Sequence, residues 1–138
     1  MSRVVYSTSF SSTPEAIMDT LTGALQALVE DGWFLLSQSF SVRLCLEEAL
    51  VNAVEHGNCN RPDLSVHVEI AEEDSRCIIR VRDEGEGFDP AAMEMPDCET
   101  LGGRGVCLMK HYMEDVHYNG DKNCVEMRFT RNTFACEV

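Results

Sequence analysis

The spacing of apolar residues divides the chain into segments with the period of a strand and segments with the period of a helix. Apolar and polar residues alternate around Val66, Val68 and Ile70, and the pattern resumes at Cys77 after a polar turn. Such alternation is typical of strands with one buried face. Strands are therefore predicted at residues 3–10, 64–71, 77–81, 115–118 and 124–130.

Other segments have the spacing of amphipathic helices. The first begins at residues 12–15, with Pro14 just inside its start, and runs to about Glu30. The second begins near Ser39 or Ser41 and ends near His56, a loop follows at 57–62, and the third helix begins between residues 103 and 105. No element is assigned to the apolar residues 33–36. The predicted core residues of the helices are Ile17, Leu21, Ala24, Leu25, Leu28, Val42, Leu46, Ala49, Leu50, Ala53, Val106, Leu108, Met109 and Met113.

The order of these segments predicts an α+β fold. Short polar turns join strands 64–71 to 77–81 and 115–118 to 124–130, so each of these pairs must be antiparallel. Three helices on one face would give a two-layer α/β sandwich with a mixed, mostly antiparallel sheet. The length of 138 residues fits one domain over 1–138. The connection from Asp83 to about Gly103 is unusually long, and loops of that length are usually functional.

Charge narrows the classes of ligand. The chain has 24 acidic and 11 basic residues, a formal net charge of −13. Because such a chain repels phosphate backbones and anionic membrane surfaces, we expect neither nucleic acid nor a membrane as a partner. Any bound phosphate must be held locally, by backbone N–H groups, a helix N-terminus or a metal ion.

The seven cysteines indicate a reducing compartment. No two of them are separated by only two residues, which excludes the C-x-x-C patterns of zinc and redox sites. Several lie in apolar runs, as Cys77 does, so we expect reduced, buried thiols. No apolar run approaches the length of a membrane span or of a leader, and we therefore expect a cytoplasmic protein.

A polar stripe on the second helix carries the first candidate chemistry. Glu48, Asn52 and Glu55 are spaced i, i+4 and i+7, opposite the core stripe. A solvated face is the plainer interpretation, but Leu44 and Val51 border the stripe, which favours a ligand pocket beneath a loop. An Asn oxygen suits Mg²⁺. Glu48, one turn earlier, could accept a proton from a hydroxyl or water that attacks a γ-phosphate.

Two glycine-containing runs supply further candidates. Asp83-Glu-Gly-Glu-Gly-Phe88 directly follows a predicted strand, where a carboxylate can accept a hydrogen bond from an amine such as that of adenine. It lacks the ligand ladder of a calcium-binding EF-hand. The second run, residues 101–106, opens the third helix, where backbone N–H groups can hold a phosphate. It is neither a Walker loop nor a dinucleotide fingerprint. Arg104 is either a phosphate contact or an exposed loop residue.

Together the three runs resemble the motifs of the Bergerat-fold (GHKL) ATPases, which include gyrase and the catalytic domains of histidine kinases. The run from Glu48 to Gly57, Glu-Ala-Leu-Val-Asn-Ala-Val-Glu-His-Gly, is similar to the N box. The runs that start at Asp83 and Gly103 are similar to the G1 and G2 boxes. The resemblance spans nearly the whole chain, in the family order, with a long lid between the last two motifs. The Glu-x-x-x-Asn-Ala-x-x-His-Gly form and the short length are most similar to anti-sigma-factor serine kinases.

The resemblance implies roles for the matching residues. Glu48 would be the catalytic base, Asn52 the Mg²⁺ ligand, and Asp83 the residue that binds the adenine amine of ATP. The remaining residues implied to contact the nucleotide are His56, Gly85, Gly87, Phe88, Gly103, Arg104, Gly105 and Val106. Members of this branch phosphorylate a serine of a small antagonist protein, sequester a sigma factor when the antagonist is absent, and are often homodimers. The lid, about 88–102, contains two prolines and many acids, so we predict that it is mobile without nucleotide.

Three other functions stay open. A non-catalytic, ATP-dependent binding module would only sequester its partner, and the presence of Glu48 favours catalysis over it. A fragment of a two-component histidine kinase is disfavoured because no helical hairpin with a phospho-acceptor histidine is expected, and His67, His111 and His117 fit structural or exposed positions. A DNA-repair or topoisomerase ATPase would need transducer domains, which the sequence does not predict.

Overall fold

The computed structural model describes residues 2–85, 104–119 and 123–135, except for the side chains of residues 104–107. Every strand and helix expected within these ranges is present, with ends that differ by a few residues. The elements are β1 (Ser2–Ser11), α1 (Pro14–Glu30), α2 (Phe40–Asn52), β2 (Ser65–Glu73), β3 (Arg76–Arg82), α3 (Arg104–Tyr112), β4 (Asp115–Asn119) and β5 (Cys124–Phe129). A 3₁₀ turn, η1 (Leu36–Gln38), precedes α2, and a π-helical turn, η2 (Ala53–Gly57), follows it.

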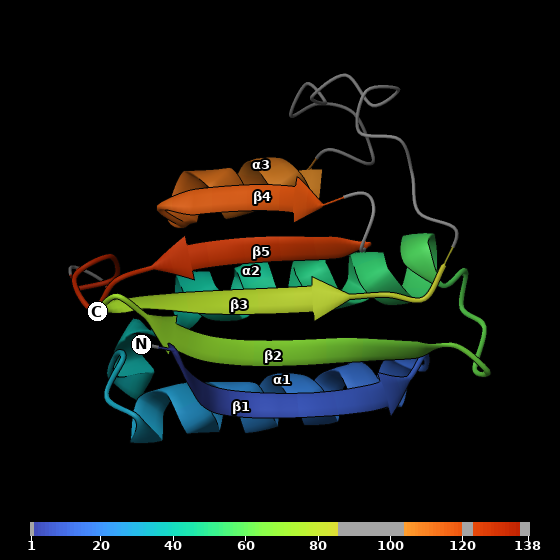
Figure 1. Ribbon diagram of the computed structural model, residues 1–138, viewed down its shortest axis with the longest axis horizontal. Coiled ribbons are helices and arrows are strands. Elements are labelled where there is room, and N and C mark those ends of the chain that lie inside the picture. Colours follow the sequence, from blue (N-terminus) through green and yellow to red (C-terminus); the bar gives the residue numbers. More distant parts are fainter. Residues whose placement is uncertain (1, 86–103, 120–122, 136–138) are drawn as a thin grey trace.

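The strands form one five-stranded sheet in the order β1-β2-β3-β5-β4, and every pairing in it is antiparallel (Figure 1). β5 lies between β3 and β4, although it is the last of the described strands along the chain. The β2–β3 hairpin turns through Asp74 and Ser75, whose φ angles of 54° and 68° are those of a two-residue type I′ turn.

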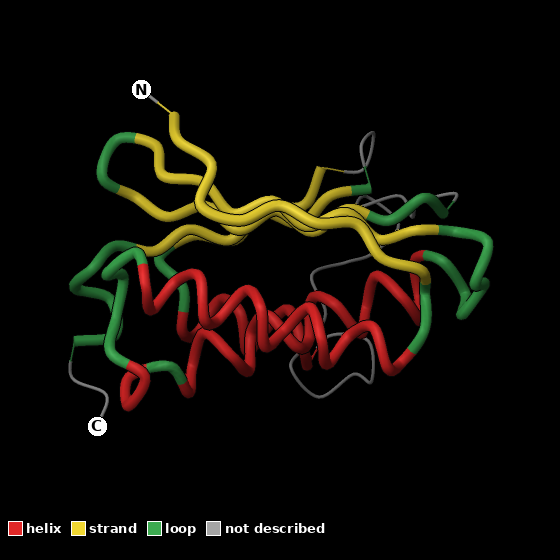
Figure 2. Tube along the Cα trace, turned by 90° about the horizontal axis from the view of Figure 1, so that it is seen from below, coloured by secondary structure: helices red, strands yellow, loops and turns green. Residues whose placement is uncertain are grey.

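All the helices cover one face of the sheet, which confirms the two-layer α+β sandwich (Figure 2). α1 begins where the sequence predicts, because Thr13 Oγ1 accepts the Ala16 N–H at 3.3 Å and Pro14 occupies the first turn. The helix ends at Glu30, and the chain reverses through Gly32, whose φ is 81°. The opposite face of the sheet carries no helix in the described parts of the chain.

The core lies between the helices and the sheet. The core residues expected on α1 and α2 are all buried, and Met109 of α3 and Met113 just after this helix are buried with them, whereas Leu108 is only half-buried. The side chain of Val106 lies outside the description. The unassigned apolar segment 33–36 divides in two, because Trp33 and Phe34 are buried whereas Leu35 and Leu36 are exposed. The Trp33 ring packs edge to face on the Phe129 ring, with 5.8 Å between the two ring centroids.

The cysteines follow the expectation with one correction. Cys45, Cys77 and Cys124 are buried, whereas Cys59 is an exposed thiol in the loop after η2. Cys98, Cys136 and the side chain of Cys107 lie outside the described residues. Across the described residues, no helix has the length and apolar character needed to cross a membrane.

Candidate functional site

The described parts of the three predicted motifs lie toward the same end of the molecule. The C-terminal ends of α2 and β3 and the first turn of α3 all lie on that side (Figure 1). α2 and α3 contact each other within the helical layer. The candidate site therefore has three parts: the polar face of α2, the loop after β3, and the start of α3.

The polar face of α2 contains Glu48 and Asn52, one turn apart and both half-buried. The opposite face is fully buried in the core. Val51, at the border of the polar face, packs partly against that core. The predicted stripe does not continue to Glu55, because α-helical geometry ends at Asn52 and the π-helical turn η2 leaves Glu55 and His56 exposed.

The loop after β3 holds a buried carboxyl group. Asp83 is only 8% exposed, and its Oδ1 accepts the Gly85 N–H at 2.9 Å. Burial raises the pKa of Asp83 above its ordinary value, while the Gly85 N–H and the charge of Arg82 act in the opposite direction. A carboxyl group in this setting is a candidate for recognising a hydrogen-bond donor on a ligand.

The second helix and this loop interlock through two glycines. A methyl group on Gly57 would overlap the Asp83 carboxyl group, and one on Gly85 would overlap the Gly57 carbonyl. Both positions need glycine because a side chain would overlap the neighbouring segment. The backbone angles at these positions do not require it. The first two motifs are thus in direct contact, with the end of η2 packed against Asp83.

Hydrogen bonds that the sequence did not predict fasten this loop. The Glu84 N–H donates to Asn58 Oδ1 at 2.8 Å, and the Ser65 N–H donates to Glu84 Oε1 at 2.6 Å. His67 Nε2 lies 3.0 Å from Glu84 Oε2. The Ser65 N–H and then His67 hold the pKa of the Glu84 carboxyl below its usual value.

Asn123, in the turn just before β5, fastens the same loop from the other side. Its Nδ2 donates to the Gly85 carbonyl at 2.6 Å, and its own carbonyl accepts the Asp83 N–H at 3.1 Å. Asn123 has a φ of 50°, a conformation that Asn tolerates better than most residues. Nothing in the local sequence signals these contacts, because Asn58 and Asn123 both fall in segments that read as ordinary turns.

The third part of the site is described only in its backbone. α3 begins at Arg104, so Gly105 and Val106 fall in its first turn, as the sequence predicts for a phosphate-binding helix start. Gly87, Phe88, Gly103 and the predicted lid at 88–102 lie outside the described residues.

The donor set limits how a metal ion could bind. In the described parts of the chain, no group of three or more His, Cys, Asp or Glu side chains is arranged to hold a metal. The half-buried Asn52 amide fits Mg²⁺, which takes one or two protein oxygens together with phosphate oxygens and water. This fit requires the metal to arrive with a phosphorylated ligand.

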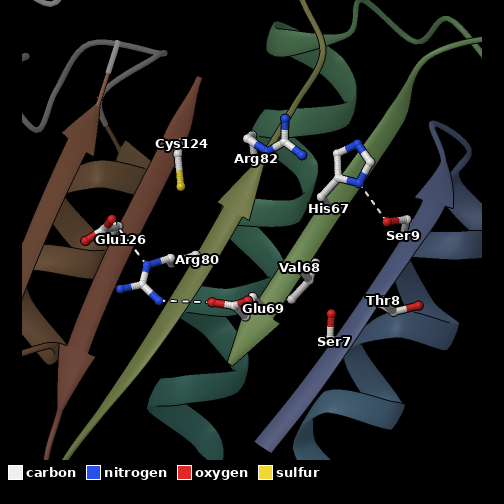
Figure 3. A pocket seen from close by; sticks show the side chains of 10 residues that line it. All are labelled: Ser7, Thr8, Ser9, His67, Val68, Glu69, Arg80, Arg82, Cys124 and Glu126. Atoms are coloured by element: carbon white, nitrogen blue, oxygen red, sulfur yellow. Dashed lines mark hydrogen bonds and ion pairs between the residues drawn. The ribbon is translucent and has the colours of Figure 1, made fainter. Parts of the chain in front are cut away.

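A hollow of about 380 Å³ lies elsewhere, on the open face of the sheet with the helices behind it (Figure 3). Within it Arg80 pairs with Glu69 at 3.0 Å and with Glu126 at 3.3 Å, and Ser9 Oγ lies 2.6 Å from His67 Nδ1. None of the three motifs lines this hollow, so it is not the candidate site described above.

Comparison with known proteins gives a match over most of the chain. The family model described as histidine kinase-like ATPase domain matches residues 10–129. Serine/threonine-protein kinase BtrW of Bordetella bronchiseptica is 27% identical over 78% of this chain and 80% of that protein. The anti-sigma F factor of Geobacillus thermodenitrificans is 29% identical over 59% of this chain and 60% of its own length. The anti-sigma F factor of Heyndrickxia coagulans is 35% identical over 51% of this chain and 53% of its own length. The matches thus span between half and three fifths of these two anti-sigma factors.

A solved structure is similar in fold. The histidine kinase domain of the EL346 blue-light activated histidine kinase from Erythrobacter litoralis superposes with a TM-score of 0.56 at 18% identity. The superposition covers 88% of this chain and 66% of that one. At this identity the likeness supports the fold alone.

Proposed function

This chain belongs to the family of histidine kinase-like ATPase domains, and from that premise we propose that it is an Mg-ATP-dependent protein serine kinase of the anti-sigma-factor type. It would phosphorylate a small antagonist protein and sequester a sigma factor, or an equivalent regulator, when the antagonist is absent. The observation that carries the proposal is the contact of the buried Asp83 carboxyl with Gly57, at the end of the helix that bears Glu48 and Asn52.

Nucleotide binding in this proposal uses all three parts of the site. One oxygen of Asp83 is engaged by the Gly85 N–H, and the other accepts a hydrogen bond from the adenine amine. The start of α3 directs backbone N–H groups toward the phosphates. The Asn52 side-chain oxygen ligates Mg²⁺, which neutralises charge on the phosphate oxygens.

Phosphoryl transfer in this proposal depends on Glu48, one helical turn from Asn52. The hydroxyl oxygen of a partner serine attacks the γ-phosphorus, and Glu48 takes the hydroxyl proton. The bond from the γ-phosphorus to the bridging oxygen breaks, and ADP leaves with the electron pair. The products are phosphoserine and ADP. The rest of the catalysis is positioning and charge stabilisation.

The relatives' names support the two-partner scheme. One relative is named a serine/threonine-protein kinase, and others are named anti-sigma F factors. A protein with both properties would switch between two protein partners according to the phosphorylation state of one of them. We include a homodimer and a cytoplasmic location in the proposal, on the family resemblance.

The test separates binding from catalysis. Calorimetric titration of ATP, with and without Mg²⁺, should give Mg-dependent binding that weakens at least about tenfold in Asn52→Ala. Glu48→Gln should keep the ATP affinity and lose about a hundredfold or more of the rate of phosphoserine formation on the antagonist. Glu47→Gln is the matched control, because Glu47 is a half-buried neighbour on the same helix with no assigned role.

Each result has one meaning. Mg-ATP binding without any phosphoserine would make the chain a non-catalytic, ATP-dependent binding module. Absence of ATP binding in the wild type would contradict the whole proposal, since every step starts from the nucleotide complex.

A further inference from the structure

We propose that Asn58 and Asn123, which lie outside the three motifs, are positioning residues that fix the Asp83 carboxyl for recognition of the adenine amine. The inference rests on the proposed ATP binding. It adds that purine specificity depends on two side chains that do not touch the base.

Asn58 is the more deeply placed of the two, with no exposed surface. Its side-chain amide makes three hydrogen bonds, to residues from three different segments. Nδ2 donates to Ser12 Oγ at 2.8 Å and to the Ser65 carbonyl at 2.9 Å, while Oδ1 accepts the Glu84 N–H at 2.8 Å. A side chain used in this way ties the end of β1, the start of β2 and the Asp83 loop to one point.

The orientation of this amide is fixed by its partners. The Glu84 N–H can only donate and the Ser65 carbonyl can only accept, so a rotation of the amide by 180° would place like groups face to face. The backbone N–H of Asn58 also donates to the Ala53 carbonyl at 2.8 Å, which closes the π-helical turn. The residue that holds Glu84 is therefore itself fixed relative to Gly57.

Asn123 completes the arrangement from the turn just before β5. It bonds Asp83 through its backbone and Gly85 through its side chain, on either side of the Glu84 held by Asn58. Each of the three loop residues thus has a hydrogen bond to one of the two asparagines. The loop has little freedom to move Asp83 relative to the end of the helix.

Such fixation matters because hydrogen bonds tolerate little displacement. A donor–acceptor distance between 2.7 and 3.2 Å is required, and a shift of about 1 Å removes the interaction. The adenine amine donates to a carboxylate, whereas the oxygen at the same position of hypoxanthine repels it. A displaced Asp83 would therefore reduce the preference for ATP over inosine triphosphate without changing contacts to the phosphates.

The experiment measures the ratio of the dissociation constants for inosine triphosphate and ATP, both with Mg²⁺, by calorimetry. The two nucleotides share their ribose and phosphates, so a general loss of stability affects both alike. We expect the wild type to prefer ATP by about tenfold or more. Asn58→Ala and Asn123→Gly should each lower that preference about fivefold or more.

Matched controls separate positioning from packing. Ser12→Ala removes another partner of the Asn58 amide but leaves its bond to Glu84. Asn60→Gly alters an exposed residue with a φ of 59°, similar to that of Asn123. Both controls should keep the wild-type ratio. In an Asp83→Asn background, Asn123→Gly should have no further effect on the ratio, because it acts through Asp83.

The outcomes are distinct from those that test the function. Failure of the wild type to bind ATP overturns the proposed function and this inference with it. If the wild type prefers ATP but the variants weaken both nucleotides equally, the asparagines are only structural and the inference is wrong while the function stands. If Asn58→Ala does not fold, Asn123→Gly decides, since glycine accepts the positive φ at that position.

Discussion

Asp83 combines a charge with a buried position, and a single residue of this kind has opposite effects on stability and on binding. Its folded-state pKa is raised by burial, so the native state binds the Asp83 proton more tightly than the unfolded chain does. The stability that Asp83 contributes is therefore fully present below its ordinary pKa of 3.8 and is lost as the pH rises through the raised value. At neutral pH the ionised side chain opposes folding.

The prediction for this residue uses Asp83→Asn. The variant should unfold at a higher temperature than the wild type at pH 7, and the difference should shrink as the pH falls through the raised pKa of Asp83 and the wild-type carboxyl becomes neutral. The variant should also bind Mg-ATP more weakly, while keeping enough affinity for the nucleotide to be titrated. Thermal unfolding of nucleotide-free protein across this pH range, followed by circular dichroism, is the measurement.

Asp63 serves as a control, because its pKa is shifted in the opposite direction to that of Asp83. Arg61 holds the pKa of Asp63 below its ordinary value, so the stability from that pair is present above pH 3.8 and is lost as the pH falls through the lowered pKa. Asp63→Asn should therefore lower stability at pH 7. A less stable Asp83→Asn at pH 7 would mean that the bond from the Gly85 N–H outweighs the cost of burial.

At the residue scale, the sequence offered candidate site residues but not the asparagines that hold the Asp83 loop. Asp83, Glu48 and Asn52 are candidates because their types and spacing match a function, and their roles stay predictions. Asn58 and Asn123 were not, because their roles come from partners distant in the chain, such as Ser12 and Gly85. Hydrogen bonds between distant segments leave no local pattern.

Among the elements, the sheet is held on its open face by a network of ion pairs. Arg80 on β3 binds Glu69 and Glu73 on β2, both at 3.0 Å, and Glu126 on β5 at 3.3 Å. Arg128 on β5 extends the network to β4 through Asp115 at 3.1 Å. One guanidinium group thus pairs with three carboxylates and reduces their mutual repulsion across neighbouring strands.

We predict that Arg80→Met lowers the free energy of unfolding by about 1 to 2 kcal/mol at low salt, because the three carboxylates lose their shared cation. The loss should shrink in 1 M salt, where the screening length is only about 3 Å. Urea unfolding at both salt concentrations measures this loss in the free energy of unfolding. Arg76→Met is the control, since Arg76 is an exposed residue of the same strand for which no ion pair is recorded within the described residues. An equal loss for both variants would contradict the network.

Elements with a regular period were predictable, and departures from regularity were not. Alternation located all five strands, and helical spacing located α1 and α2 together with their buried faces. The π-helical turn at Ala53–Gly57 was missed, because its sequence is compatible with one more α-helical turn. The turn forms where Gly57 packs on Asp83, which is a tertiary contact.

For the molecule as a whole, packing of the two layers buries three of the four described cysteines and leaves one exposed. Cys45, Cys77 and Cys124 are buried, whereas Cys59 is exposed. Burial also raises the pKa of the Cys77 thiol, so little of the reactive thiolate is present near neutral pH.

We predict that iodoacetamide modifies Cys59 in the native protein far faster than the three buried cysteines, whose labelling should wait for unfolding. Mass spectrometry of peptides from timed reactions measures the four rates. In urea above the unfolding midpoint the rates should become similar. Rapid labelling of Cys77 without denaturant would contradict the buried core.

The strand order also has a consequence for protein synthesis. Of the five described strands, β5 is the last to leave the ribosome, yet it occupies a position inside the sheet, between β3 and β4. Because about 50 residues separate the end of β3 from the end of β5, translation at about 5–20 residues per second leaves the β3 edge unpaired for about 2 to 10 seconds. The nascent chain therefore carries an open β edge until β5 has been synthesised, and chaperones that bind such edges would act in that interval.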